Sequence, residues 1–326
     1  MKPVPKMLVF EKGHLRISHS SFGHTFGEAC ENKFALTKLF SHVKRGDESH
    51  AGEVGKALHT GLESYFISGG DKNQAIADFM IAYPHHITQY NNYRSLEASY
   101  ASLLSILETD LLQDDEIVNI VDHEGVTRPA VEIPFEIFLD GFLLNDDPPI
   151  TVSYIGWIDL IMYQRLSGAR RVLDLKSHRD TVKDLTPKYF NSVQCLPYGL
   201  VLEYMLGHTI EFFNITYVTC FIDLMEPKIK IYTFPKGKNE ISNWFTMFVS
   251  DLWRLKEYFQ IQWFPRRGGA CMSWKRPCPM FEICTMSDWE SIQGYLTGDE
   301  QPVDNYDATF KPWVSFNLEI PKLGGG

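Results

Sequence analysis

Two aspartates and one lysine are the residues of this sequence whose types and spacing best suit a reaction. Asp159 ends the run GWID, and Asp174 and Lys176 belong to the later run LDLK. Carboxylate oxygens are the ligands that Mg²⁺ and Mn²⁺ prefer. The Lys176 ammonium could orient a water molecule or stabilise charge developing on phosphorus. The set therefore predicts metal-dependent phosphodiester hydrolysis, with the backbone carbonyl of Leu175 as a further candidate ligand.

The strands that would carry these three residues are predicted to form a hairpin. Residues 154–163 (YIGWIDLIMY) and 171–177 (RVLDLKS) are strand-like, and a Ser-Gly pair at 167–168 is a turn signal between them. A hairpin turning there sets Asp159 opposite Lys176. Because side chains alternate between the faces of a strand, both aspartates and the lysine would share one face.

The rest of the chain alternates between helical and strand-like patterns. We expect helices within 18–42, 54–66, 72–83 and 92–113, strands from about 130, a helix over 185–206, strands over 212–222 and 228–234, and a long helix over 239–260. This order predicts an α/β protein with a mixed central sheet flanked by helices. No regular pattern is visible beyond residue 296, so that tail is expected to be irregular.

One integrated domain is predicted, with three parts. Residues 1–125 would form a helical N-terminal region that carries Cys30 and the His59 helix. Residues 126–262 would form the sheet core, and 263–326 a cysteine-rich, metal-binding segment with the tail. The length is sufficient for one large domain with a full core.

Bulk properties limit the classes of protein. No apolar run is long enough for a membrane span, and the N-terminus lacks the apolar run of a secretory signal. This predicts a cytoplasmic protein, in a bacterium or a virus-infected host cell, whose six cysteines are thiols or metal ligands. The net charge of −10 disfavours a nucleic-acid partner without excluding one, because a local basic groove is enough for binding.

Four of the six cysteines are candidates for a second metal site: Cys30 near the start, and Cys271, Cys278 and Cys284 near the end. Four thiolates could hold a 4Fe–4S cluster or Zn²⁺. Such a site would join the two ends of the chain and close a long loop, which is a structural role. Cys195 and Cys220 fall in a predicted helix and a predicted strand, where packing in the core is the better interpretation.

The order of four short motifs resembles the RecB-like branch of the PD-(D/E)XK nuclease superfamily. The motifs are GxxxH at 55–59, GWID at 156–159, LDLK at 173–176 and QxxxY at 194–198. The resemblance implies a restriction-endonuclease-like core. It also implies a set of site residues: His59, Asp159 and Asp174 as metal ligands, Lys176 as the catalytic lysine, and Gln194 and Tyr198 as residues that position DNA or the metal shell. Pro197, inside the last motif, would kink or start a helix there.

The cysteine layout is similar to that of AddB-like exonucleases and CRISPR-adaptation nucleases, with one cysteine before the nuclease core and three after it. The resemblance implies a 4Fe–4S cluster on those four cysteines. Cys278 and Cys284 keep the five-residue gap common in those proteins, whereas Cys271 lies further away. Cys271 is therefore the least secure ligand, and zinc remains an alternative to iron.

Basic residues in two places are candidates for binding DNA: Arg266, Arg267, Lys275 and Arg276 around the cysteine loop, and Arg179 and Lys183 after LDLK. Trp263 and Trp274 are interleaved with the first group, a combination that suits single-stranded DNA through phosphate contacts and base stacking. A solvated loop with two packing tryptophans is an equally good interpretation.

The sequence as a whole favours a Mg²⁺- or Mn²⁺-dependent deoxyribonuclease, most suited to exonucleolytic cleavage of single strands or DNA ends. The resemblance implies recombination, repair or phage DNA metabolism. The chain has no GxxxxGK[ST] phosphate loop, so a helicase or recombination partner would have to open the strands. Two alternatives are a nuclease fold that binds DNA or a protein without cutting, and a redox or metal-sensing protein built on the cysteines.

Overall fold

The computed structural model describes most of the chain between residues 13 and 322. The described ranges are 13–39, 50–85, 94–109, 115–122, 124–165, 168–178, 184–222, 227–261, 263–273, 276–278, 281, 284 and 310–322.

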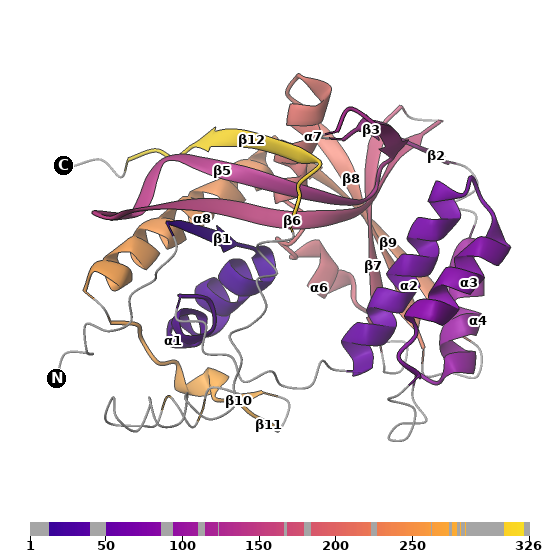
Figure 1. The fold of residues 1–326 in the computed structure, drawn as a ribbon, viewed down its shortest axis with the longest axis horizontal. Coiled ribbons are helices and arrows are strands. Elements are labelled where there is room, and N and C mark those ends of the chain that lie inside the picture. Colours follow the sequence, from indigo (N-terminus) through magenta and orange to yellow (C-terminus); the bar gives the residue numbers. More distant parts are fainter. Residues whose placement is uncertain are drawn as a thin grey trace.

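A mixed eight-stranded sheet runs through the molecule (Figure 1). Six strands follow one another across it: β12 (Val314–Glu319), β5 (Val131–Asp146), β6 (Pro149–Gln164), β7 (Arg170–His178), β8 (Phe212–Phe221) and β9 (Lys228–Gly237). The pairs β12–β5 and β7–β8 are parallel, and the others on this path are antiparallel. Two short strands, β1 (His14–Ile17) and β2 (Asp115–Ile117), also pair with β6.

Helices cover the sheet in two groups (Figure 1). The first group consists of α2 (His50–Ile67), α3 (Lys72–Ala82) and α4 (Leu96–Leu107), gathered at one end of the sheet. The second consists of the π-helical segment η1 (His19–Ala29), α7 (Pro197–Leu206) and α8 (Lys238–Gln260). The smaller elements are α1 (Glu31–Phe34), η2 (Ala35–Leu39), β3 (Asn119–Val121), β4 (Thr127–Pro129), α6 (Thr186–Phe190), η4 (Gly268–Ala270), β10 (Met272–Ser273) and β11 (Arg276–Pro277). None of the described helices is both long and apolar enough to cross a membrane.

Local sequence explains where several helices begin and end. Asp71 caps α3 by accepting hydrogen bonds from the backbone N–H groups of Asn73 and Gln74, and the Ser95 hydroxyl does the same for α4. Pro197 occupies the first turn of α7, where its missing N–H costs nothing. That helix ends at Gly207, whose φ of 69° is the left-handed conformation that glycine adopts most easily.

The two groups of helices bury two separate hydrophobic clusters. The first cluster, beneath α7, α8 and η1, includes Ile133 of β5 and Ile158 of β6. The second, beneath α2, α3 and α4, includes Val131 of β5 and Leu160 of β6. Residues two apart on a regular strand share a face. Both long strands therefore exchange sides between these positions, at Glu132 and at Asp159.

The mixed α/β sheet flanked by helices confirms the predicted fold class, and three details of the prediction are wrong. The tail beyond 296 is not wholly irregular, because β12 extends the sheet beside β5. The helix predicted over 185–206 is two helices, since 191–196 is non-helical and Pro197 starts α7. The region before residue 126 is not wholly helical, because it contributes β1 and β2 to the sheet.

Candidate active site

Three carboxylates form a row across neighbouring strands. The β5–β6 register pairs Val131 with Leu160 and Ile133 with Ile158, which sets Glu132 opposite Asp159. The β6–β7 register pairs Leu160 with Leu173. Extended by one residue, the same register sets Asp159 opposite Asp174. The hairpin is thus shifted by two residues from the prediction that paired Asp159 with Lys176. A shift of two preserves the alternation of faces, so the aspartates and Lys176 still converge.

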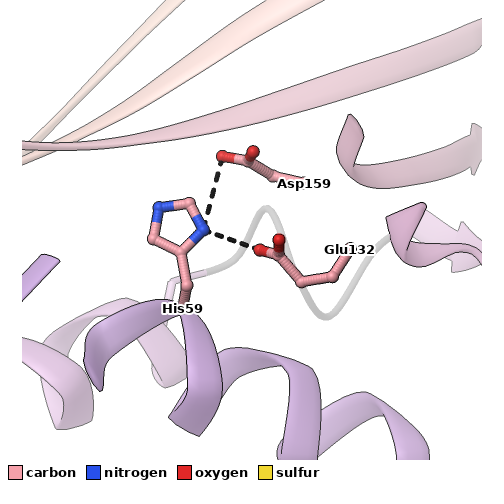
Figure 2. Close-up of side chains that lie close together, drawn as sticks. All are labelled: His59, Glu132 and Asp159. Atoms are coloured by element: carbon pink, nitrogen blue, oxygen red, sulfur yellow. Dashed lines mark hydrogen bonds and ion pairs between the residues drawn. The ribbon is translucent and has the colours of Figure 1, made fainter. Parts of the chain in front are cut away.

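Helix α2 brings His59 to this row (Figure 2). Leu58 is fully buried in the second hydrophobic cluster and fixes the helix against the sheet, so that the neighbouring His59 faces the strands. Its Nδ1 atom lies 2.6 Å from Glu132 Oε1 and 3.8 Å from Asp159 Oδ2. One nitrogen and two carboxylate oxygens lie within 4.8 Å of one another, a spacing that could hold a metal ion, and no other described residues form such a group.

The charges at this site do not neutralise one another. Burial would lower the pKa of His59, but Asp159 and Glu132 outweigh it and raise the pKa to about 9. Burial raises the pKa of Asp159, and the His59 imidazolium offsets this only in part. Burial also raises the pKa of Asp174 to about 6, against the attraction of Lys176. Carboxylates with raised pKa values favour a further positive charge beside them.

Lys176 and Asp174 form an ion pair next to this group. Lys176 Nζ lies 2.8 Å from Asp174 Oδ2, and Asp174 is 1% exposed. Burial would lower the pKa of Lys176, but the two aspartates raise it above its usual range, so the amine stays charged. The Leu175 backbone N–H donates to Asp159 Oδ2 at 2.7 Å. Gln194 lies near the far side of Asp174, with its Nε2 3.4 Å from Oδ1.

An open cleft of about 660 Å³ gives access to these residues. Lys176, His59 and Glu132 line it, so the lysine and two of the three metal-ligating candidates are reachable from outside. Trp157 and Glu63 are also on its wall. Burial, with the nearby charge of Glu132, raises the pKa of Glu63. The arrangement can place a phosphate group between a bound cation and a lysine, which is the requirement for phosphodiester hydrolysis.

A scan of protein-family models matches residues 17–285 to the PD-(D/E)XK nuclease superfamily. The match covers most of the chain and includes every residue of the row. The chain belongs to the PD-(D/E)XK nuclease superfamily.

Comparisons outside the family models add little. No curated protein matches the chain. Among solved structures, the chain is similar to the crystal structure of a proposed exonuclease from Eubacterium rectale, with 16% identity, a TM-score of 0.43, and coverage of 83% of this chain and 93% of the other. It is also similar to the crystal structure of the protein SSO0001, with 16% identity, a TM-score of 0.27, and coverage of 75% and 89%. Both TM-scores are too low to establish a shared fold.

Glu132 is the residue of this nuclease site that sequence reasoning missed. It lies in the alternating run VEIPFEIFL, where it resembles an ordinary outward polar residue. In the structure its φ is 47°, a left-handed conformation that is costly for a residue other than glycine. Backbone strain of this kind persists where the surroundings demand it, often at functional sites. Here it lies where β5 exchanges sides, and the Glu132 carboxylate meets His59.

Tyr198 does not have the position predicted for it. Its side chain is 5% exposed and packs edge-on against Phe135 in the first hydrophobic cluster, with ring centroids 5.9 Å apart. A contact with DNA does not fit this burial, so that prediction is corrected to a packing role. Gln194 precedes Pro197 and lies outside α7, so the two residues of the QxxxY motif are not neighbours on one helix.

The basic residues predicted to bind DNA have different outcomes. Arg179, Lys183 and Lys275 lie outside the described residues, and only the backbone of Arg276 is described. Arg266 is exposed, and a phosphate contact there stays a prediction. The Arg267 guanidinium instead donates two hydrogen bonds to the Glu31 carboxylate.

The six cysteines lie in different surroundings. Cys195 and Cys220 are fully buried, one in each hydrophobic cluster, which confirms their packing role. Cys30 is buried between η1 and α1, while Cys271, Cys278 and Cys284 are partly exposed. Asn32 Nδ2 donates to Cys284 Sγ at 2.8 Å, so a contact joins the first and last parts of this set.

Proposed function

We propose that this protein is a metal-dependent deoxyribonuclease that degrades single-stranded DNA or DNA from its ends. The observation that carries the proposal is the group formed by His59, Glu132 and Asp159 beside the Lys176–Asp174 pair. His59, Glu132 and Lys176 line one open cleft. Membership of a nuclease superfamily supports the reaction class. The direction of attack and the choice of single strands extend beyond the family match.

The residues present fit a hard divalent cation. Asp174 Oδ2 is buried, and its contact in the described part of the chain is the Lys176 ammonium group at 2.8 Å. Asp159 and Asp174 have raised pKa values, so a cation would relieve the cost of burying both charges. Carboxylate oxygens with one imidazole suit Mg²⁺ or Mn²⁺. His59, Glu132 and Asp159 would hold the ion, with Asp174 and the Leu175 carbonyl as further candidate ligands.

The cation, when bound, would polarise the scissile phosphate and lower the pKa of an attacking water. The protein residues supply the rest. Lys176 keeps its proton because both aspartates stabilise the charge, and its ammonium group can stabilise the negative charge that develops on phosphorus. Gln194 orients Asp174 from the side opposite Lys176. Since imidazole must be neutral to bind a metal, His59 would have to lose its proton when it holds the cation.

Two kinds of side chain at the cleft support single-stranded DNA as the substrate. The cleft is lined by Lys176 and Lys56, which can contact phosphates, and by Trp157, which can stack on an unpaired base. A protein of this kind needs a helicase or recombination partner to expose single strands, in recombination, repair or phage DNA metabolism. We place this activity in the cytoplasm of a bacterium or of an infected host cell.

We also propose that Cys30, Cys271, Cys278 and Cys284 hold a 4Fe–4S cluster. The Cys278 backbone N–H donates to the Cys271 carbonyl at 2.8 Å, and Asn32 joins Cys284 to the residues beside Cys30, so the four thiols lie on contacting segments. Zinc on the same four thiolates is the alternative, and analysis of the purified protein for iron, sulfide and zinc decides between the two.

The test is cleavage of end-labelled single- and double-stranded DNA, and of circular single strands, with Mg²⁺, Mn²⁺ or EDTA. We compare wild type with Lys176→Ala and with Lys228→Ala, a matched control at an exposed residue of β9. The expected result is cation-dependent cleavage of linear single strands that the control retains and Lys176→Ala loses. Protein is prepared without oxygen so that loss of a cluster does not imitate an inactive site.

Two outcomes would change this proposal. Cleavage of circular single strands at the same rate would replace exonuclease with endonuclease action. If folded, metal-replete wild type cuts no DNA, the protein is instead a binding module on a nuclease fold. In that case DNA retention on a gel, with and without Mn²⁺, identifies the ligand.

A further inference from the structure

Three consecutive residues, Cys30, Glu31 and Asn32, lie against the cysteine-rich segment from the other end of the chain. Glu31 forms two hydrogen bonds with Arg267: Arg267 Nε donates to Oε2 at 2.9 Å, and Nη2 donates to Oε1 at 2.7 Å. Asn32 makes two more contacts, from its Nδ2 to Cys284 Sγ at 2.8 Å and from its backbone N–H to the Pro265 carbonyl at 3.1 Å. None of these contacts requires a metal.

The Glu31–Arg267 pair is the stronger of these links. The Glu31 side chain is only 3% exposed, so its charge needs a partner to be tolerated. A bidentate guanidinium–carboxylate pair fixes orientation as well as distance. It therefore fixes the direction in which the cysteine-rich segment leaves residue 267.

Local hydrogen bonds carry this orientation to the cysteines. The Cys271 backbone N–H donates to the Gly268 carbonyl at 3.1 Å, which closes the short η4 turn directly after Arg267. The Cys278 N–H then donates to the Cys271 carbonyl at 2.8 Å, across the β10–β11 hairpin. Cys284 is held separately by Asn32. Cys30 is thus adjacent to Glu31, Cys284 contacts Asn32, and Cys271 lies one short turn after Arg267. Cys278 is linked to Glu31 only indirectly, through its hydrogen bond to Cys271.

We propose that Glu31 and Asn32 are positioning residues that assemble the cysteine site before any metal binds. Glu31 holds the Cys271–Cys278 hairpin beside Cys30 through Arg267, and Asn32 holds and polarises the Cys284 sulfur. The assembly is independent of which metal binds. Only the expected effect of Asn32 on an iron–sulfur cluster rests on the function proposed above.

The Asn32 contact has a chemical consequence beyond position. An N–H group that donates to a ligand sulfur stabilises negative charge on it. The reduced cluster carries one more negative charge than the oxidised cluster, so such a bond raises the reduction potential. Removing the donor while keeping the side-chain size, as in Asn32→Leu, is expected to shift the potential to more negative values. A purely structural role would leave the potential unchanged.

The Glu31–Arg267 pair, which we call the clasp, is tested with Glu31→Gln in metal-free protein. The control is Glu28→Gln, the same change at a nearby residue whose side chain is 59% exposed and pairs only with His24 in the described part of the chain. Hydrogen exchange of peptides covering 263–284 is measured by mass spectrometry. We expect about tenfold faster exchange in Glu31→Gln and wild-type exchange in the control, because the glutamine amide cannot accept both hydrogen bonds from Arg267. Equal exchange in all three proteins overturns the clasp.

The role of Asn32 is tested with the purified holoprotein. Iron and sulfide are quantified first, and the reduction potential and the rate of iron loss in air are then measured for wild type and Asn32→Leu. We expect a more negative potential and about tenfold faster iron loss, as for other partners of metal ligands. An unchanged potential and rate overturn this role.

The proposed cluster and the proposed clasp can fail separately. If wild type prepared without oxygen holds no iron, the cluster proposal fails, yet hydrogen exchange in Glu31→Gln still decides the clasp. Alkylation of Cys284, followed by mass spectrometry, then replaces the potential as the readout for Asn32. Slower alkylation in Asn32→Leu supports the contact, because the donor stabilises the reactive thiolate, and an unchanged rate overturns it.

Discussion

Glu132 and Glu136 lie on the same strand, β5, in opposite electrostatic surroundings. Glu136 is 1% exposed and fully satisfied: Arg16 donates from Nε and Nη2 at 2.9 and 3.1 Å, and the Ser153 hydroxyl donates at 2.6 Å. His14 adds a contact at 3.3 Å. Burial would raise the pKa of Glu136, but these hydrogen bonds lower it to about 2. The Glu136 carboxylate therefore needs no further partner, and its role is structural.

The carboxylates in the row that contains Glu132 are not fully compensated by their neighbours in this way. Burial raises the pKa values of Asp159 and Asp174, although His59 and Lys176 are close to them. The two protein cations thus compensate three carboxylates only in part. A sheet that can satisfy an acid completely at Glu136 leaves its neighbours unsatisfied at the cleft. The difference supports the proposal that the row binds a cation from outside, which would offset the cost of these buried carboxylates.

The largest expected difference between the two regions is in catalysis. Asp159→Asn should lower the rate of DNA cleavage by about 10³-fold, because it removes a cation ligand next to the reacting phosphate. Glu136→Gln should cleave at the wild-type rate when assayed well below its unfolding temperature. The measurement is initial rates on a labelled linear single strand at saturating Mn²⁺. Equal losses in both variants would erase the distinction.

Stability should show the reverse order. Glu136→Gln leaves Arg16 without its buried counter-charge and should lower the free energy of unfolding by about 3 kcal/mol. In metal-free protein, Asp159→Asn should not lower it, because the neutral amide removes a poorly compensated buried charge. Urea unfolding in EDTA measures both. Asp146→Asn is the control, at a carboxylate on the same strand β5 that is 67% exposed, and should change stability by less than about 0.5 kcal/mol.

Divalent cations should stabilise one region only. At a hundred times the dissociation constant, Mn²⁺ should add about 2.7 kcal/mol to wild-type stability, because it binds the folded state alone. The same increment should appear in Glu136→Gln and be absent in Asp159→Asn. Thermal unfolding with and without Mn²⁺ gives the comparison. If Mn²⁺ stabilises Asp159→Asn as much as wild type, the ion binds at another site.

The pH dependence of stability separates the Glu136 contribution further. The folded pKa of about 2 lies below the usual value of 4.5, so the stabilisation is present above pH 4.5 and is lost as the pH falls toward 2. The difference in unfolding free energy between wild type and Glu136→Gln should therefore be full at pH 6 and shrink steadily below about pH 4.5. If the difference in unfolding free energy stays constant down to pH 2.5, it does not come from ionised Glu136.

The smallest expected effect is at Gln194. Its contact with Asp174 spans 3.4 Å, which is long for a hydrogen bond, so Gln194→Ala should slow cleavage by only about threefold. Asn191→Ala, at an exposed residue that caps α6 nearby, is the control. A loss approaching that of Asp159→Asn would instead make Gln194 a direct participant.

Much of the site could be predicted because its residues are local to one hairpin. A hairpin fixes faces by alternation, so Asp159, Asp174 and Lys176 were expected to converge, and the two-residue shift in register did not alter this. The helix of His59 was also visible from its apolar spacing. The central strands and long helix followed from periodicity, and the structure confirms the mixed α/β class.

The remainder depends on contacts between distant parts of the chain. Glu132 joins the site only because β5 exchanges sides there, at a φ of 47° that no local pattern announces for glutamate. Strand β12 forms by pairing with β5 from the other end of the chain, so its own sequence gives little signal. Tyr198 matched a motif, but its burial against Phe135 was set by the first hydrophobic cluster.

The most direct test of the central claim is Mn²⁺ binding by metal-free protein, measured by isothermal titration calorimetry without DNA. Wild type is compared with Glu132→Gln and with the exposed control Asp146→Asn. If His59, Glu132 and Asp159 hold the cation, Glu132→Gln should weaken binding by at least about tenfold while the control binds as wild type does. Wild-type affinity in Glu132→Gln would contradict the assignment of this group as the metal site.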